Sequence, residues 1–178
     1  MKVIILENLR IICSIVDVYD ILYKMTTQDD IYFEISDSGN IVKLEPKQLV
    51  RQGSELDWDN NWIITTITVK GGKFSGQYEA EFMTIDFEKF KQELSLLYNN
   101  LNGSATFNGL EEQLELKIKG DGIGHFEMIV TACDQTGYGG KLKFTMSFDQ
   151  TSIKELVSQL ERITKNFPIV GDFNIKNE

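Results

Sequence analysis

The sequence predicts an α+β fold, in which a largely antiparallel, strongly twisted β-sheet packs against two long amphipathic helices. Two periodicities indicate this fold class: several segments alternate apolar and polar residues, whereas two others repeat apolar residues every three or four positions. Both predicted helices follow strands directly, and short loops join most of the strands, as antiparallel pairing requires. The 178 residues contain no linker-like stretch, so one domain over residues 1–178 is expected.

The N-terminal part is expected to consist of strands. Residues 3–6 and 9–18 are apolar and largely β-branched, which favours extended structure. Residues 31–35 and 41–44 are predicted to pair as a hairpin, because the intervening letters SDSGN favour a turn. Residues 45–53 are ambiguous between a turn and a single helical turn.

The remaining strands are predicted between residues 62 and 148. Apolar and polar residues alternate in most of them, which is typical of a strand with one buried face. Leu142, Phe144 and Met146, for example, alternate with Lys143 and Thr145. The predicted strands cover residues 62–69, 74–82, 105–107, 114–118, 125–132 and 142–148.

The first helix is predicted over about residues 86–102, where apolar residues share one helical face. Asp86 is the expected N-cap, because a carboxylate there accepts hydrogen bonds from the free N–H groups of the first turn. Gly103 is placed to adopt the left-handed conformation that often ends a helix.

The second helix is predicted over about residues 152–166, again with one apolar face. Ser152 and Glu155 have the spacing of a capping box, and Asp149 or Thr151 are alternative caps. At an offset of 66 residues, the apolar positions of the two strand–helix segments coincide. A repeated strand–strand–helix unit explains this match, and so does a chance alignment of two amphipathic segments.

The chain is acidic, with a formal net charge of −9 and a pI of about 4.7. This charge disfavours nucleic-acid binding and favours either a basic partner or simple solubility. Residues 28–59 carry eight acidic and three basic residues, and they form either a solvated sheet edge or a partner-binding surface. The acidic residues of this segment are Asp29, Asp30, Glu34, Asp37, Glu45, Glu55, Asp57 and Asp59.

The cellular location is expected to be the cytoplasm. The two cysteines, Cys13 and Cys133, are far apart in apolar surroundings, which is typical of buried thiols in a reducing compartment. Charged residues interrupt the apolar N-terminus, so neither a signal peptide nor a membrane span is predicted.

Catalytic and metal-binding motifs are not found. The single histidine, His125, opens an apolar strand without the nucleophile spacing of a catalytic triad, which favours a structural role. Asp57 and Asp59 alone are a weak signal for a cation, and the glycine runs lack the order of a phosphate-binding loop. No cofactor is predicted. A hydrolase that uses paired carboxylates remains the enzyme alternative, because 27 acidic residues are present.

The most unusual local cluster is the sequence LDWDNNW at residues 56–62. Two tryptophans among acids and amides are typical of an aromatic binding anchor with a polar rim. The alternative is structural: Trp62 begins a core strand, and Trp58 covers the sheet edge.

The second part of the chain contains a set of short motifs in a fixed order. They are Asp59-Asn60-Asn61-Trp62-Ile63, Phe74-Ser75-Gly76, Phe82, the helix at 87–101, Glu112-x-Leu114-x-Leu116, Gly124-His125, Leu142-x-Phe144, Asp149-Gln150-Thr151 and Phe167-Pro168-Ile169. This combination resembles the WapI-like family of bacterial immunity proteins. The resemblance covers roughly residues 57–170, whereas residues 1–56 show no comparable similarity and residues 169–178 form an expected peripheral tail.

The resemblance implies a non-enzymatic binding protein that neutralises the C-terminal toxin domain, often a nuclease, of a contact-dependent or secreted polymorphic toxin. An acidic protein is suited to the basic cleft of such a toxin, with aromatic anchors supplying affinity. The alternative is a small-molecule-binding or structural module. The expected toxin-binding residues are Asp57, Trp58, Asp59, Asp29, Asp30 and Asp37.

Overall fold

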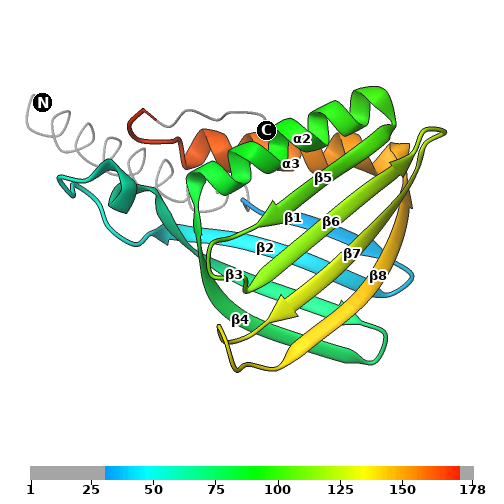
Figure 1. Cartoon of the computed structure of the whole chain (residues 1–178), viewed down its shortest axis with the longest axis horizontal. Helices are drawn as coiled ribbons and strands as arrows, with labels where there is room; N and C mark the ends of the chain where they lie inside the picture. The colour runs from blue at the N-terminus through cyan, green and yellow to red at the C-terminus, as the bar shows by residue number, and fades with distance from the viewer. Residues whose placement is uncertain (1–30, 173–178) are drawn as a thin grey trace, which may run out of the picture. The chain divides into compact units, whose positions relative to one another are not determined.

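A computed structural model describes residues 31–172, which form two four-stranded antiparallel sheets and two long helices (Figure 1). The first sheet has the order β1 (Phe33–Asp37), β2 (Asn40–Leu49), β3 (Trp62–Gly71) and β4 (Phe74–Met83). The second has the order β5 (Asn102–Asn108), β6 (Leu114–Asp121), β7 (His125–Cys133) and β8 (Lys141–Asp149). The helices are α2 (Thr84–Asn100) and α3 (Gln150–Asn166), and a 3-10 helix, η1 (Asp57–Asn61), precedes β3.

The predicted α+β fold class is confirmed, although the strands divide between two sheets rather than one. The strands predicted at residues 3–6 and 9–18 lie outside the described residues, as do Cys13, Asp29 and Asp30. The single domain over residues 1–178 therefore stays a prediction.

The segment at residues 45–53, which is ambiguous in the sequence, contains no helical turn. Its first five residues belong to strand β2, which continues to Leu49. The pairing of β2 with β3 shifts between Pro46 and Gln48. β1 pairs with β2 only as far as Leu44, so Pro46 lies where β2 has a single neighbour. A proline lacks the N–H for a ladder hydrogen bond, and a bulge beside an open edge tolerates this loss.

The repeated unit predicted from the sequence is seen in part. Each sheet is built from four consecutive strands and is followed by one helix. α2 begins at Thr84 and α3 at Gln150, which reproduces the offset of 66 residues. The first strands, which begin at Phe33 and Asn102, are 69 residues apart and do not keep this offset.

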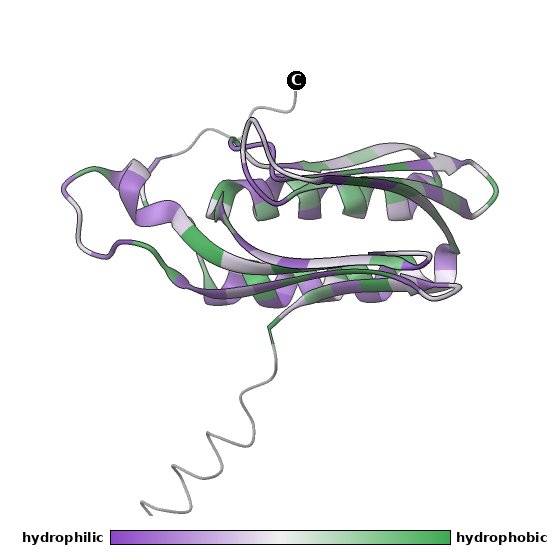
Figure 2. Ribbon diagram, turned by 90° about the horizontal axis from the view of Figure 1, so that it is seen from below, coloured by the Kyte–Doolittle hydropathy of each residue, from purple (hydrophilic) through white to green (hydrophobic). Residues whose placement is uncertain are grey.

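The core lies where the inner faces of the two sheets meet α2. Hydrophobic and hydrophilic residues alternate along the strands, so each sheet buries one face (Figure 2). The Phe107 ring of β5 is fully buried, with its centroid 5.0 Å from that of Phe82 on β4. It lies 5.1 Å from Phe87 and 5.5 Å from Phe90, both on α2. Phe107 thus joins both sheets to the helix.

The two helices pack against each other and along sheet edges (Figure 1). The Glu34 N–H of edge strand β1 donates to the Gln159 side chain of α3, at 2.8 Å. The Thr106 N–H of edge strand β5 donates to the Glu93 carboxylate of α2, at 2.7 Å. Each helix therefore satisfies a backbone donor that an edge strand would otherwise leave open.

The helix starts differ from those predicted, because each strand leads directly into its helix. Met83 is the N-cap of α2, and Asp86 is instead the third helical residue, where its carboxylate accepts the Met83 N–H at 2.9 Å. Asp149 caps α3 by accepting the Thr151 N–H, which confirms one predicted alternative and excludes the Ser152 cap. The left-handed residue after α2 is Leu101 rather than Gly103.

Asp86 gives stability an unusual pH dependence, because burial raises the pKa of its carboxyl group to about 6. A folded-state pKa above the unfolded value means that this contribution is present at low pH and is lost as the pH rises through about 6. Asp86→Asn removes the titration while retaining an acceptor for the Met83 N–H. We therefore expect the stability of the unaltered chain to fall by about 2–3 kcal/mol relative to Asp86→Asn between pH 4 and pH 7.

Urea unfolding of both proteins at several pH values measures this difference. Parallel stability profiles across the range would show that Asp86 does not titrate as its burial predicts.

Candidate functional site

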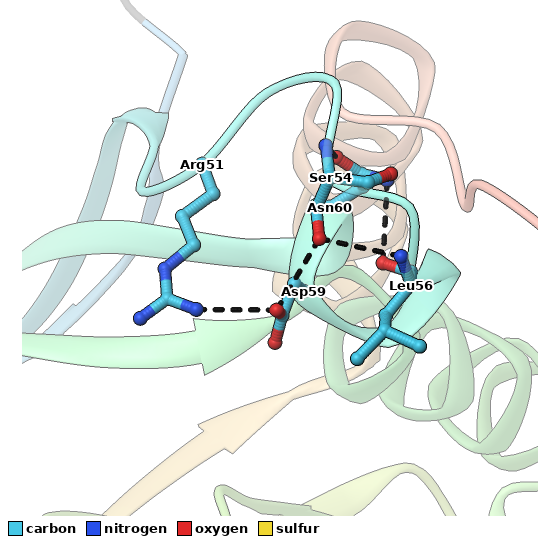
Figure 3. A network of polar contacts seen from close by, with 5 residues as sticks. All are labelled: Arg51, Ser54, Leu56, Asp59 and Asn60. Atoms are coloured by element: carbon cyan, nitrogen blue, oxygen red, sulfur yellow. Dashed lines mark hydrogen bonds and ion pairs between the residues drawn. The ribbon is translucent and has the colours of Figure 1, made fainter.

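The loop before β3 is held in place by a network of side chains (Figure 3). The Arg51 guanidinium lies 3.1 Å from the Asp59 carboxylate. The Asn60 side chain accepts the Ser54 N–H at 2.9 Å and donates to the carbonyl oxygens of Ser54 and Leu56. These bonds close the loop onto η1, so the exposed residues of this region have fixed positions.

Asn61 connects this loop to two distant parts of the chain. Its side chain is fully buried, and its Oδ1 accepts the Thr84 hydroxyl at 2.6 Å and the Val170 N–H at 2.9 Å. Its Nδ2 donates to the carbonyl oxygens of Asp57 and Val170, at 2.6 and 2.8 Å. One amide therefore ties together η1, the start of α2 and the segment after α3.

The segment after α3 also packs closely on η1. Gly171 has a φ of +90°, and a Cβ at this position would collide with the Asp57 side chain. The start of the predicted peripheral tail is thus anchored at Val170 and Gly171, whereas residues 173–178 lie outside the described part of the chain.

This region combines exposed apolar residues with acidic neighbours, and we name it the Trp58 surface: Leu56, Asp57, Trp58, Asp59 and Val170. Residues Leu56, Trp58 and Val170 are 65%, 48% and 39% exposed. Glu55 and Asp172 extend the acidic character, and Arg51 is the basic residue next to it. An exposed tryptophan between carboxylates has the composition of a protein-binding hot spot.

The structure brings together three of the six predicted site residues. Asp57, Trp58 and Asp59 belong to η1, whereas Asp37 is the last residue of β1, at the opposite end of the first sheet. The ten-residue strand β2 separates the two places, a span of about 30 Å at the usual rise per residue. The Asp37 carboxylate accepts the Ser38 hydroxyl and the Ser147 N–H of edge strand β8.

Asp37 borders a second feature, an open hollow of about 1140 Å³ on the outer face of the second sheet. His125 is exposed and lines this hollow together with Asp121 and Asp149. The backbone N–H of His125 donates to the Asp121 carboxylate at 3.1 Å. Hydrogen bonds from the Ile123 N–H to Asp121 and from Thr151 to Asp149 lower the pKa of these carboxyl groups. Both acids are therefore ionised near neutral pH.

Between residues 31 and 172, no three His, Cys, Asp or Glu side chains are grouped in a way that could hold a metal ion. The helices of this part of the chain are too short or too polar to cross a membrane.

The family model that describes the immunity protein WapI-like family matches residues 31–168. The chain belongs to this family. The match begins at residue 31 and so includes β1 and β2, although the motifs noticed in the sequence begin near residue 57. Membership in the family indicates an immunity function.

A search of curated proteins finds no match. Among solved structures, the one titled "Crystal structures of trypanosoma bruciei MRP1/MRP2" is similar, with a TM-score of 0.48 and 9% identity. The similar region covers 85% of this chain and 95% of that chain.

Val170 is the functional candidate that sequence reasoning missed. It lies 109 residues after Asn61, and no local pattern connects the two. The pair of amides at Asn60 and Asn61 in the LDWDNNW cluster was the available signal, because buried amides require several partners.

Proposed function

We propose that this protein is an immunity protein that binds and neutralises the C-terminal toxin domain of a contact-dependent or secreted polymorphic toxin. The observation that carries this proposal is the family match over residues 31–168. The toxin domain is a basic nuclease in this proposal, and the Trp58 surface is where the two proteins meet. The complex forms in the cytoplasm, where a nuclease toxin would act.

The charge of the chain supports a basic partner. A net charge of −9 accelerates the encounter with a positively charged nuclease domain and disfavours competition by nucleic acid. Charges at the rim of an interface mainly affect the association rate, so the affinity depends on apolar anchors. Trp58 and Leu56 provide such anchors beside Asp57 and Asp59.

The rigidity of the surface supports tight binding. Ordering a flexible loop on binding costs free energy, and the Asn60 and Asn61 hydrogen bonds fix this loop in the free protein. Neutralisation then requires no chemistry: the bound protein covers the toxin cleft and excludes the substrate.

Co-expression with the cognate toxin domain tests the function. We expect cells that produce both proteins to survive, and the two proteins to elute together in gel filtration. Continued killing, together with separate elution of the two folded proteins, would refute the immunity function.

Substitutions test the surface itself. Trp58→Ala is expected to weaken toxin binding by about 30-fold or more, because it removes the central aromatic anchor. Asp59→Lys is expected to slow association by about 10-fold and to weaken its dependence on salt. Isothermal titration calorimetry and stopped-flow kinetics measure the two effects.

Tyr138→Ala is the matched control for Trp58→Ala, because Tyr138 is 84% exposed on the loop between β7 and β8. It should bind like the unaltered chain. If Trp58→Ala and Asp59→Lys also bind unchanged, the interface lies elsewhere, and the Asp37 end of the first sheet becomes the next candidate.

A further inference from the structure

The edges of the two sheets are not protected equally. On three edge strands, a backbone N–H that points away from the sheet donates to a side chain of another element. These donors are the N–H groups of Glu34 on β1, Thr106 on β5 and Ser147 on β8. Edge strand β4 has such an acceptor only at its end, where Asp86 accepts the Met83 N–H. Within residues 31–172, no comparable cover is found over the first part of β4.

The register shows which backbone groups of β4 are open. Gly71 and Phe74 flank the two-residue turn and form its terminal hydrogen-bonded pair, so hydrogen-bonded and outward-facing residues alternate from there. The outward-facing residues are Ser75, Gln77, Glu79, Glu81 and Met83. The Met83 N–H does point away from β3, toward Asp86, which confirms this assignment.

The outward N–H and C=O groups of Ser75, Gln77 and Glu79 have no protein partner among the described residues. These three residues are exposed. A row of free donors and acceptors at a residue spacing of two is the template to which an additional strand pairs.

An acidic hollow adjoins the open edge. It has a volume of about 430 Å³ and lies where the loop between β5 and β6 approaches β4. Three carboxylates line it, and no basic side chain of the described chain forms an ion pair with them. The Tyr78 hydroxyl donates to the Gln113 carbonyl at 2.7 Å and holds the loop in position. The lining residues are Trp62, Ile64, Glu79, Ala80, Glu81, Glu111 and Gln113.

We propose that β4 accepts an extended, basic segment of the toxin domain as an added strand. The backbone of that segment pairs with Ser75, Gln77 and Glu79, and a lysine or arginine side chain enters the hollow between Glu79, Glu81 and Glu111. This proposal rests on the proposed immunity function. Trp62 lines the hollow and directly follows η1, so one partner reaches both the Trp58 surface and the β4 edge.

Gln77→Pro tests the pairing, because a proline removes the outward N–H and places its ring at the edge. Edge strands tolerate proline where the N–H faces solvent, so the variant is expected to fold. We expect at least 10-fold weaker binding to the toxin domain for Gln77→Pro than for the control Gln77→Ala. Glu111→Lys on the loop should weaken binding by about 10-fold, with the loss reduced at high salt.

Hydrogen exchange of the unaltered chain tests the same pairing without a substitution. The amides of Ser75, Gln77 and Glu79 should exchange at least 10-fold more slowly in the complex. If the chain binds the toxin but Gln77→Pro equals Gln77→Ala and these amides are not protected, the strand pairing is wrong and the immunity function stands. If the chain does not bind the toxin at all, both proposals fall.

Discussion

Phe107→Ala is expected to lower the free energy of unfolding by about 3–5 kcal/mol, the range typical of a large aromatic side chain removed from a packed core. The Phe107 ring is fully buried and contacts the rings of Phe82, Phe87 and Phe90, so its removal leaves a cavity between both sheets and α2. Equilibrium unfolding in urea measures the change.

Phe74→Ala is the control for this prediction, because Phe74 is 73% exposed at the turn between β3 and β4. It should change stability by no more than about 0.5 kcal/mol. A loss below about 1 kcal/mol for Phe107→Ala would contradict the central position of this ring in the core.

Asn61→Ala is expected to lower the free energy of unfolding by about 3 kcal/mol, because it removes four hydrogen bonds from a buried site. The Thr84 hydroxyl and the Val170 N–H lose their acceptor. The effect extends beyond stability. Asp57 and Val170 lose the group that fixes them, so toxin affinity should fall as well.

The exchange rate of the Val170 amide distinguishes this local role from general destabilisation. It should rise in Asn61→Ala by more than the amide exchange rates within β6 and β7. Asn166→Ala, which removes an exposed amide that donates to the Arg162 carbonyl, serves as the control and should leave these exchange rates unchanged. An unchanged exchange rate of the Val170 amide in Asn61→Ala would show that other contacts hold the C-terminal segment.

The local elements of this fold are readable from the sequence. The change from a two-residue to a 3.6-residue period locates β8 and α3, and the apolar positions Ile153, Leu156 and Leu160 are all buried as expected. The predicted N-cap of α2 was wrong, because the identity of a cap depends on how directly the strand joins its helix.

The division into two sheets could not be predicted in the same way. Alternation shows that a strand buries one face, but it does not show which strands pair. That depends on contacts between distant residues, such as the ring of Phe107 against that of Phe82. The packing of α2 against both β5 and α3 is equally invisible in the sequence.

In the candidate site, too, the sequence predicts only what is close together in the chain. Asp57, Trp58 and Asp59 are neighbours in the chain, so their shared surface followed from the sequence. Val170 is held beside them by the Asn61 side chain, and Asp37 is separated from them by the length of β2. Charge alone grouped Asp37 with the others, although charge does not specify position.

The central claim is that this chain neutralises a toxin by covering it, and the most direct test is a stoichiometric titration. Nucleic-acid cleavage by the purified toxin domain is measured while increasing amounts of the purified chain are added. We predict that activity falls linearly and reaches zero near one equivalent, with Trp58→Ala requiring a large excess. Undiminished cleavage at a tenfold molar excess of the folded, unaltered chain would contradict the claim.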